Sequence, residues 1–233
     1  MRRRVAAIAL VAPLLGVAAD APAADTAIPA EAQAWLSSGS DARVENDAWG
    51  DLSGHGTRDW AGLVDVTMPN DEERYHLRVV VFMQRPDGRY RLAVQSATQR
   101  EDCGTSDCQL DDMRIAKQSL FVGWRARWHG CNDAVTFQFR ARDGHWPLIG
   151  VVTRSTEDPW GTDENDQPLS GRSLSVTIDH NRLTGDAIVT RRTDTGAARV
   201  SRFKLIKPVE DLENFDSFTV PVDKEIPGLC GRG

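Results

Sequence analysis

Short runs of alternating apolar and polar residues, separated by turn sequences, constrain the fold of this chain most strongly. In "SLFVGWRARW" (119–128), Leu120, Val122 and Trp124 fall on one side of an extended chain, and Arg125 and Arg127 fall on the other. This period of two is typical of a half-buried strand. Comparable runs occupy residues 76–84, 89–97, 134–142, 146–155, 172–180, 186–193 and 198–207.

The sequences between these runs predict tight reversals of the chain. Arg85-Pro86-Asp87-Gly88 separates the first two runs listed above and is a strong hairpin signal, and Asp143-Gly144 is a second one. No long stretch shows helical period. We therefore predict an all-β fold, an antiparallel meander that forms a sandwich, an open barrel or a propeller-like array. A regular propeller has the least support, because no repeat of fixed period is visible.

Residues 1–23 have the pattern of a signal peptide. Three arginines precede an apolar run (5–19), and the small residues of "APAA" (21–24) follow it. A membrane-spanning helix needs about 20 apolar residues, so the run is too short for an anchor. We expect a soluble protein that is periplasmic or secreted. It would have a polar N-terminal segment (24–49) with one short helical piece, a β-rich domain (50–207) and an extended C-terminal tail (208–233).

The charge of the chain limits the classes of partner. The full sequence has a net charge of −6, and removing residues 1–23 takes away three arginines and Asp20, which moves it to −8. An acidic protein of this kind is not expected to bind nucleic acid or an anionic membrane. A basic protein partner would suit it better, with solubility as the plainer explanation of the charge.

The four cysteines, Cys103, Cys108, Cys131 and Cys230, predict two disulfides in an oxidising compartment, with three possible pairings. Because only four residues separate Cys103 from Cys108, we favour a local disulfide there and a Cys131–Cys230 disulfide that holds the tail. A zinc site is the alternative, although the cysteine spacing matches no usual zinc pattern.

The stretch "GDLSGHGTRDW" (50–60) has the outline of a calcium loop. Asp51, Ser53, the Thr57 carbonyl and Asp59 would take the first, third, seventh and ninth ligand positions, and Gly56 would supply the turn. His55, at the fifth position, offers no oxygen. Calcium is the one cofactor that the sequence suggests, and a metal-free turn of the same shape is the alternative.

This loop is similar to the "GDLNGDG..D" loop of FG-GAP-like and VCBS-like exported proteins. The chain also resembles a group of small exported bacterial β-rich proteins in a Trp-Arg-x-Arg-Trp strand (124–128), an "LIG" strand (148–150) and a late "LTG" (183–185). The resemblance covers roughly residues 50–193. It implies a calcium-type loop before a β-rich body and, for some related proteins, a role as periplasmic immunity proteins or inhibitors that act against peptidoglycan hydrolases.

A second candidate site is the acidic loop "STEDPWGTDENDQPLSG" (155–171). A single aromatic among carboxylates could anchor an inhibitor in a basic cleft, with the acids speeding association. The residues that would bind the partner are Glu157, Asp158, Trp160, Asp163, Glu164 and Asp166. The alternatives are a shared cation at Asp163, Asn165 and Asp166, or a solvated loop.

Motifs for catalysis are scarce in the sequence. No G-x-S-x-G or H-E-x-x-H occurs, and the five histidines are scattered. The Trp-Arg-x-Arg-Trp strand is interpreted as core aromatics with outward-facing arginines rather than as a sugar site. We therefore predict a non-enzymatic periplasmic binding protein, an inhibitor or immunity protein against a cell-wall hydrolase. The alternatives are a calcium-stabilised structural module and an unrecognised periplasmic hydrolase.

Overall fold

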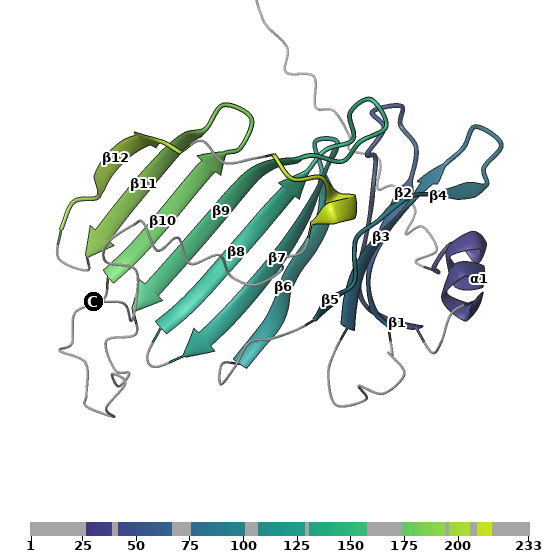
Figure 1. The fold of residues 1–233 in the computed structure, drawn as a ribbon, viewed down its shortest axis with the longest axis horizontal. Coiled ribbons are helices and arrows are strands. Elements are labelled where there is room, and N and C mark those ends of the chain that lie inside the picture. The colour runs from purple at the N-terminus through teal and green to yellow at the C-terminus, as the bar shows by residue number, and fades with distance from the viewer. Residues whose placement is uncertain are drawn as a thin grey trace, which may run out of the picture.

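Two antiparallel sheets make up most of the fold in the computed structural model (Figure 1). The structure describes residues 27–38, 42–66, 76–100, 107–128, 131–157, 174–193, 196–205 and 209–215, with the backbone alone at residues 99–100, 107–111 and 128. The predicted signal peptide lies outside these residues. None of the helices described here is long and apolar enough to cross a membrane.

The small sheet has the strand order β1-β2-β3-β4, and a short β5 also pairs with β3. Its strands are β1 (Ala42–Gly50), β2 (Asp59–Val66), β3 (His76–Gln84), β4 (Tyr90–Gln95) and β5 (Gln99–Arg100). The predicted turn after residue 84 joins β3 to β4, with Gly88 at a φ of 81°.

The large sheet is a seven-stranded meander in which each strand pairs with the next along the chain. Its strands are β6 (Asp107–Ala116), β7 (Ser119–Trp128), β8 (Cys131–Phe139), β9 (Leu148–Glu157), β10 (Leu174–Asn181), β11 (Asp186–Thr193) and β12 (Arg199–Lys204). The prediction of an all-β antiparallel fold is confirmed. Neither sheet closes into a barrel, and the two packed sheets fit the sandwich among the predicted forms.

The segment predicted as polar, residues 24–49, contains two regular elements. The helix α1 (Ala30–Ser38) extends the short helical piece that the sequence predicts, but β1 was not predicted. Ala48 is its one buried residue, and a bulge between Val44 and Asn46 interrupts its alternation, so the pattern of a half-buried strand is weak. The calcium-type loop therefore joins β1 to β2 rather than leading into the first strand.

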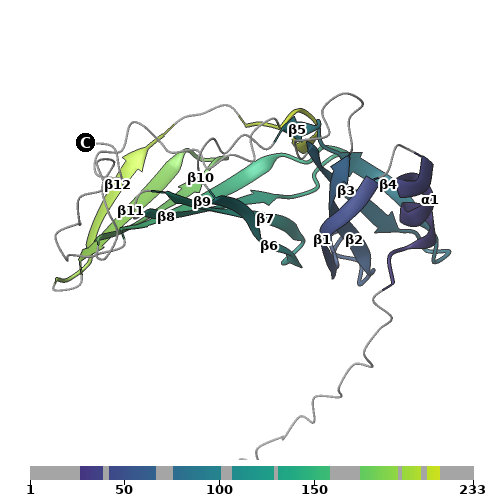
Figure 2. The ribbon, with the colours of Figure 1, turned by 90° about the horizontal axis from the view of Figure 1, so that it is seen from below.

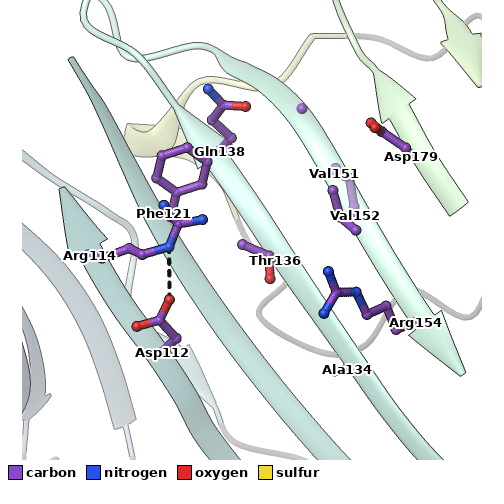
Figure 3. Close-up of a pocket in the computed structure, with 11 residues that line it drawn as sticks. Asp112, Arg114, Phe121, Ala134, Thr136, Gln138, Val151, Val152, Arg154 and Asp179 are labelled. Carbon is purple, nitrogen blue, oxygen red and sulfur yellow. Dashed lines mark hydrogen bonds and ion pairs between the residues drawn. The ribbon is translucent and has the colours of Figure 1, made fainter. Parts of the chain in front are cut away.

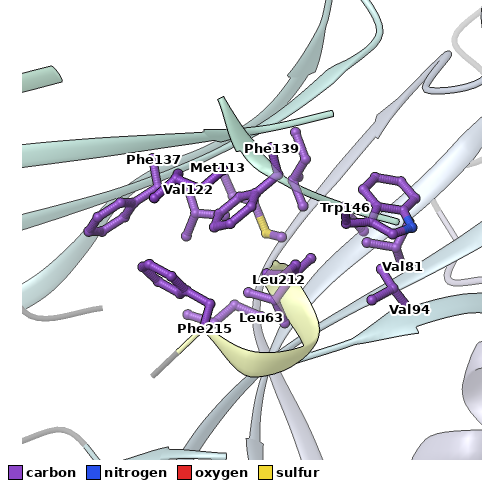
Figure 4. Packing of buried hydrophobic residues seen from close by; sticks show 14 of the residues in the cluster. Leu63, Val81, Val94, Met113, Val122, Phe137, Phe139, Trp146, Leu212 and Phe215 are labelled. Carbon is purple, nitrogen blue, oxygen red and sulfur yellow. The ribbon is translucent and has the colours of Figure 1, made fainter. Parts of the chain in front are cut away.

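One apolar core lies between the two sheets (Figure 4). Leu63, Val81 and Val94 contribute from the small sheet, and Val122 and Phe137 contribute from the large sheet. Figures 1 and 2 place the small sheet at the β6 end of the large sheet, where β1 contacts β6. The strands β9–β12 extend away from this junction.

The other side of the small sheet packs against α1. Trp60, Val80 and Phe82 are buried there, with Ala32 of the helix and the partly buried Trp35 against them. The Trp35 and Phe82 rings meet edge to face at 6.5 Å. The small sheet is therefore covered on both sides, which explains why β2 and β3 read as nearly continuous apolar runs.

Residues 209–215, which we call the C-terminal strap, link the two sheets. Its 3₁₀ turn η1 (Leu212–Asn214) lies within the segment predicted as an extended tail. Leu212 N–H donates to Trp146 O at 2.9 Å on the large-sheet side, and Ala97 N–H, beyond β4, donates to Glu213 O at 3.1 Å. Leu212 and Phe215 are buried in the core, with 0% and 2% of their surface exposed.

Candidate functional site

The loop between β1 and β2 brings together the four residues predicted as calcium ligands. The Asp51 carboxylate accepts hydrogen bonds from Gly54 N–H at 2.7 Å, Gly56 N–H at 2.9 Å and the Ser53 hydroxyl at 3.1 Å. Gly54 and Gly56 have φ values of 77° and 75°, a left-handed conformation that glycine adopts without strain. These hydrogen bonds hold the pKa of Asp51 below its ordinary value of 3.8, and the bond from Gly56 contributes most.

Asp59 is the buried centre of the same loop, with none of its surface exposed. Its carboxylate accepts the Leu52 N–H at 2.8 Å and the Gln84 N–H of β3 at 2.9 Å. The Thr57 hydroxyl donates to it at 3.2 Å and also lies 2.9 Å from the Ser53 hydroxyl.

Both carboxylates of the loop are thus satisfied by hydrogen-bond donors of the protein itself, and His55 is exposed. In the part of the chain that the structure describes, no group of three or more His, Cys, Asp or Glu side chains is arranged to hold a metal ion. Calcium binding by this loop and the metal-free alternative both remain untested predictions of the sequence.

The acidic loop predicted to bind a partner lies mostly outside the described residues. Only Glu157 is described, as the half-buried last residue of β9, paired in register with Cys131. The remaining predicted residues, Asp158, Trp160, Asp163, Glu164 and Asp166, lie outside. This site stays a prediction.

Cys131 is buried at the start of β8 and is disulfide-bonded. The sulfurs of Cys103, Cys108 and Cys230 lie outside the described side chains, so the predicted pairings are not tested.

The side of the large sheet that faces away from the core forms a broad exposed surface, which we call the outer face. Strand alternation and cross-strand register put basic side chains from five strands on it: Arg114, Arg125, Arg127, Arg154, Arg192, Arg202 and Lys204. Its described acidic side chains are fewer: Asp112, Asp179 and Asp186. Among the described side chains, basic groups therefore outnumber acidic groups on this face of a chain that is acidic as a whole.

A hollow of about 270 Å³ lies in the outer face over β6–β10 (Figure 3). Thr136 lies at its middle, on β8, and Ala134 lies two residues away on the same face. Gly150, on the neighbouring strand, also lines the hollow and lies beside the Gln138 side chain, whose oxygen would be only 3.1 Å from a Cβ there. Ala134 and Thr136 thus give the hollow a floor of short side chains.

Two arginines border the hollow from opposite sides (Figure 3). Arg114 of β6 donates through Nε to Asp112 at 3.0 Å, and its guanidinium lies 3.9 Å from the centroid of the Phe121 ring. Arg154 of β9 is exposed and points towards Thr136, and Asp179 of β10 lies beyond it.

The sequence predicts part of this surface. The alternation in residues 119–128 puts Arg125 and Arg127 opposite the buried side chains, and both are exposed in the structure. The hollow is different, because Arg114 and Arg154 lie on strands β6 and β9, far apart in sequence. Only the order and register of four strands bring them to one depression, and no local motif signals it.

Comparison of the chain with models of protein families, with curated proteins and with solved structures found no match. The outer face and its hollow must therefore be interpreted from their own chemistry.

Proposed function

We propose that this chain is an exported binding protein of the inhibitor or immunity type, which contacts a partner protein through the outer face of the large sheet. One observation carries the proposal: an exposed sheet surface whose described side chains are mostly basic, on a chain whose net charge is −6. Arginine is favoured at protein interfaces because its planar guanidinium forms two parallel hydrogen bonds to a carboxylate.

The charge distribution favours an acidic patch on a protein as the partner surface. A polyanion such as nucleic acid would meet the net negative charge of the rest of the chain, and Asp112, Asp179 and Asp186 lie among the arginines. Neighbouring positive and negative side chains suit a protein as the partner, because complementary charge pairs fix the orientation of the two proteins. The sequence resemblance makes a cell-wall hydrolase the first partner to test.

The test uses exported proteins of the cells that produce this chain. Proteins captured on the immobilised chain are identified, purified and measured for affinity against three forms: wild type, Arg192→Glu/Arg202→Glu, and Arg89→Glu. Arg192 and Arg202 are exposed on the outer face, whereas Arg89 is exposed in the β3–β4 turn of the small sheet.

We expect the double reversal to weaken the complex at least tenfold, because like charges opposed at an interface cost several kcal/mol. Arg89→Glu should leave the affinity unchanged. Equal affinities for all three forms would refute the outer face as the binding surface. If the partner is a hydrolase, the wild-type chain should also inhibit it.

A further inference from the structure

We propose that the hollow in the outer face is a subsite for a single carboxylate, the side chain of an acidic residue on the partner, with Arg154 as its main ligand. This inference rests on the proposed function and specifies the chemistry of one contact within it. The hollow lies in the outer face, and the two arginines at its borders are both exposed to an approaching group.

Arg154 is the available cation of the hollow. None of the ion pairs or hydrogen bonds in the described part of the chain uses its guanidinium, and the side chain points over the floor towards Thr136 (Figure 3). Asp179 lies on the next strand and pairs in register with Val152, two residues away from Arg154 on the same face of the sheet. A carboxylate entering the hollow would therefore meet a guanidinium that still has its donors to offer.

Arg114 supplies a second positive charge that is already fixed in place. Its contacts with Asp112 and with the Phe121 ring hold the guanidinium at the border of the hollow. The ion pair to Asp112 uses Nε, so the two terminal nitrogens of Arg114 can donate to other acceptors. A side chain that is fixed before binding loses less conformational entropy when a ligand arrives.

The floor of the hollow suits a short polar side chain. Thr136 offers a hydroxyl at the floor beside the short side chain of Ala134, whereas the Gln138 amide already donates to the Ser119 hydroxyl at 3.1 Å. A water molecule has a share of about 30 Å³ in the liquid, so a hollow of about 270 Å³ has room for the end of a Glu or Asp side chain.

The acidic residues at the borders distinguish a carboxylate from a phosphate. Asp112 and Asp179 both line the hollow, so they repel a ligand with two negative charges more strongly than a single carboxylate. The same two carboxylates can accept hydrogen bonds from the amide N–H groups of a peptide backbone. Together these features indicate an acidic residue within a polypeptide as the occupant.

The proposal is tested by titrating the ¹⁵N-labelled chain with N-acetylglutamate α-amide and following backbone amide shifts by NMR. N-acetylglutamine amide is the uncharged control ligand, and inorganic phosphate is the competing anion. The variants are Arg154→Gln, Arg154→Lys, the floor-filling Ala134→Leu and, as a matched control, Arg192→Gln, which removes the same charge from the outer face away from the hollow.

We expect saturable shifts at residues 134–138 and 150–154 with the glutamate ligand and none with the glutamine ligand. Arg154→Gln and Ala134→Leu should weaken binding at least fivefold, Arg154→Lys should restore part of it, and Arg192→Gln should not change it. The amide spectrum of each variant shows whether it is folded. Arg154→Gln removes the charge and Ala134→Leu fills the space, so the hollow is tested in two independent ways.

Three outcomes would overturn the subsite: no saturable shifts, phosphate binding as tightly as the carboxylate, or equal weakening by Arg192→Gln. Partner binding that is sensitive to Arg192→Glu/Arg202→Glu but not to Arg154→Gln or Ala134→Leu would refute the subsite and leave the proposed function in place. The reverse result, carboxylate binding without any effect of the double reversal on the partner, would refute the proposed function instead.

Discussion

Asp59 attaches the β1–β2 hairpin to β3 with one buried carboxylate. It accepts backbone N–H groups from both elements, from Leu52 in the loop and from Gln84 at the end of β3. Donors left without an acceptor in a buried site are costly, since each loses its hydrogen bonds to water as well. The acids of this loop therefore have a structural explanation that requires no metal.

We expect Asp59→Asn to lower the free energy of unfolding by about 2 kcal/mol, because the amide nitrogen would face backbone donors in place of a carboxylate oxygen. The matched control is Asp87→Asn in the exposed β3–β4 turn, where the carboxylate accepts the Arg89 N–H at 3.1 Å. That change should cost less than about 0.5 kcal/mol. Urea unfolding at pH 7 measures both, and equal costs would contradict the central role of Asp59.

Asp51 makes the stability of the same loop depend on pH. Its pKa is lowered on folding, chiefly by the Gly56 hydrogen bond, so its contribution is complete above the unfolded pKa, near 4, and is lost as the pH falls through the folded value. We expect Asp51→Asn to reduce the loss of stability between pH 7 and pH 3. Some loss should persist, because Lys204 lowers the pKa of Asp186 in the same direction. An unchanged pH profile, measured by thermal unfolding, would contradict this.

At the scale of elements, the C-terminal strap matters more than its length suggests. Phe215 packs against Phe137 and Phe139 with ring centroids 4.9 and 5.3 Å apart, and Asp211 accepts the Trp146 N–H at 2.6 Å. The Glu210 carbonyl accepts the Leu148 N–H of β9, and the Glu213 carbonyl accepts the Ala97 N–H beyond β4. A short irregular segment thus completes a core that the strands alone leave open.

We expect Phe215→Ala to cost about 4 kcal/mol of unfolding free energy, the usual range for removing a buried aromatic side chain. Val209→Ala, in the same strap but with 46% of its surface exposed, should change the stability by less than about 0.5 kcal/mol. If the two variants unfold at the same urea concentration, the strap does not stabilise the core as described.

The sequence predicts elements better where burial alternates cleanly. The runs 119–128 and 186–193 coincide with β7 and β11, in which buried and exposed residues alternate. The run 76–84 coincides with β3 although both of its sides are buried, because it is a short apolar run that ends at a strong turn signal. By contrast, β1 was missed, since Asn46 and Asp47 follow a bulge and only one of its residues is buried. The strand β6, with Asp111-Asp112 next to its own bulge, escaped prediction for the same reason.

At the scale of the whole molecule, the site was less predictable than the fold. Local patterns show which side chains leave a strand on the exposed side, but not which strands are neighbours. The hollow depends on Arg114, Thr136 and Arg154 lying on β6, β8 and β9 of one meander, a fact of sheet order. The two acidic residues of the calcium-type loop are linked through the Ser53 and Thr57 hydroxyls, because a short turn limits where they can lie.

The position of the strap at residues 209–215 also bears on when the protein can fold. The core between the sheets includes Leu63, which is made early, and Phe215, which is among the last residues that the structure describes. A nascent chain can form its hairpins as they emerge, yet it cannot close the space between the sheets until residues 209–215 have been synthesised. Until then the inner apolar surfaces of both sheets stay open, and chaperones can bind such surfaces.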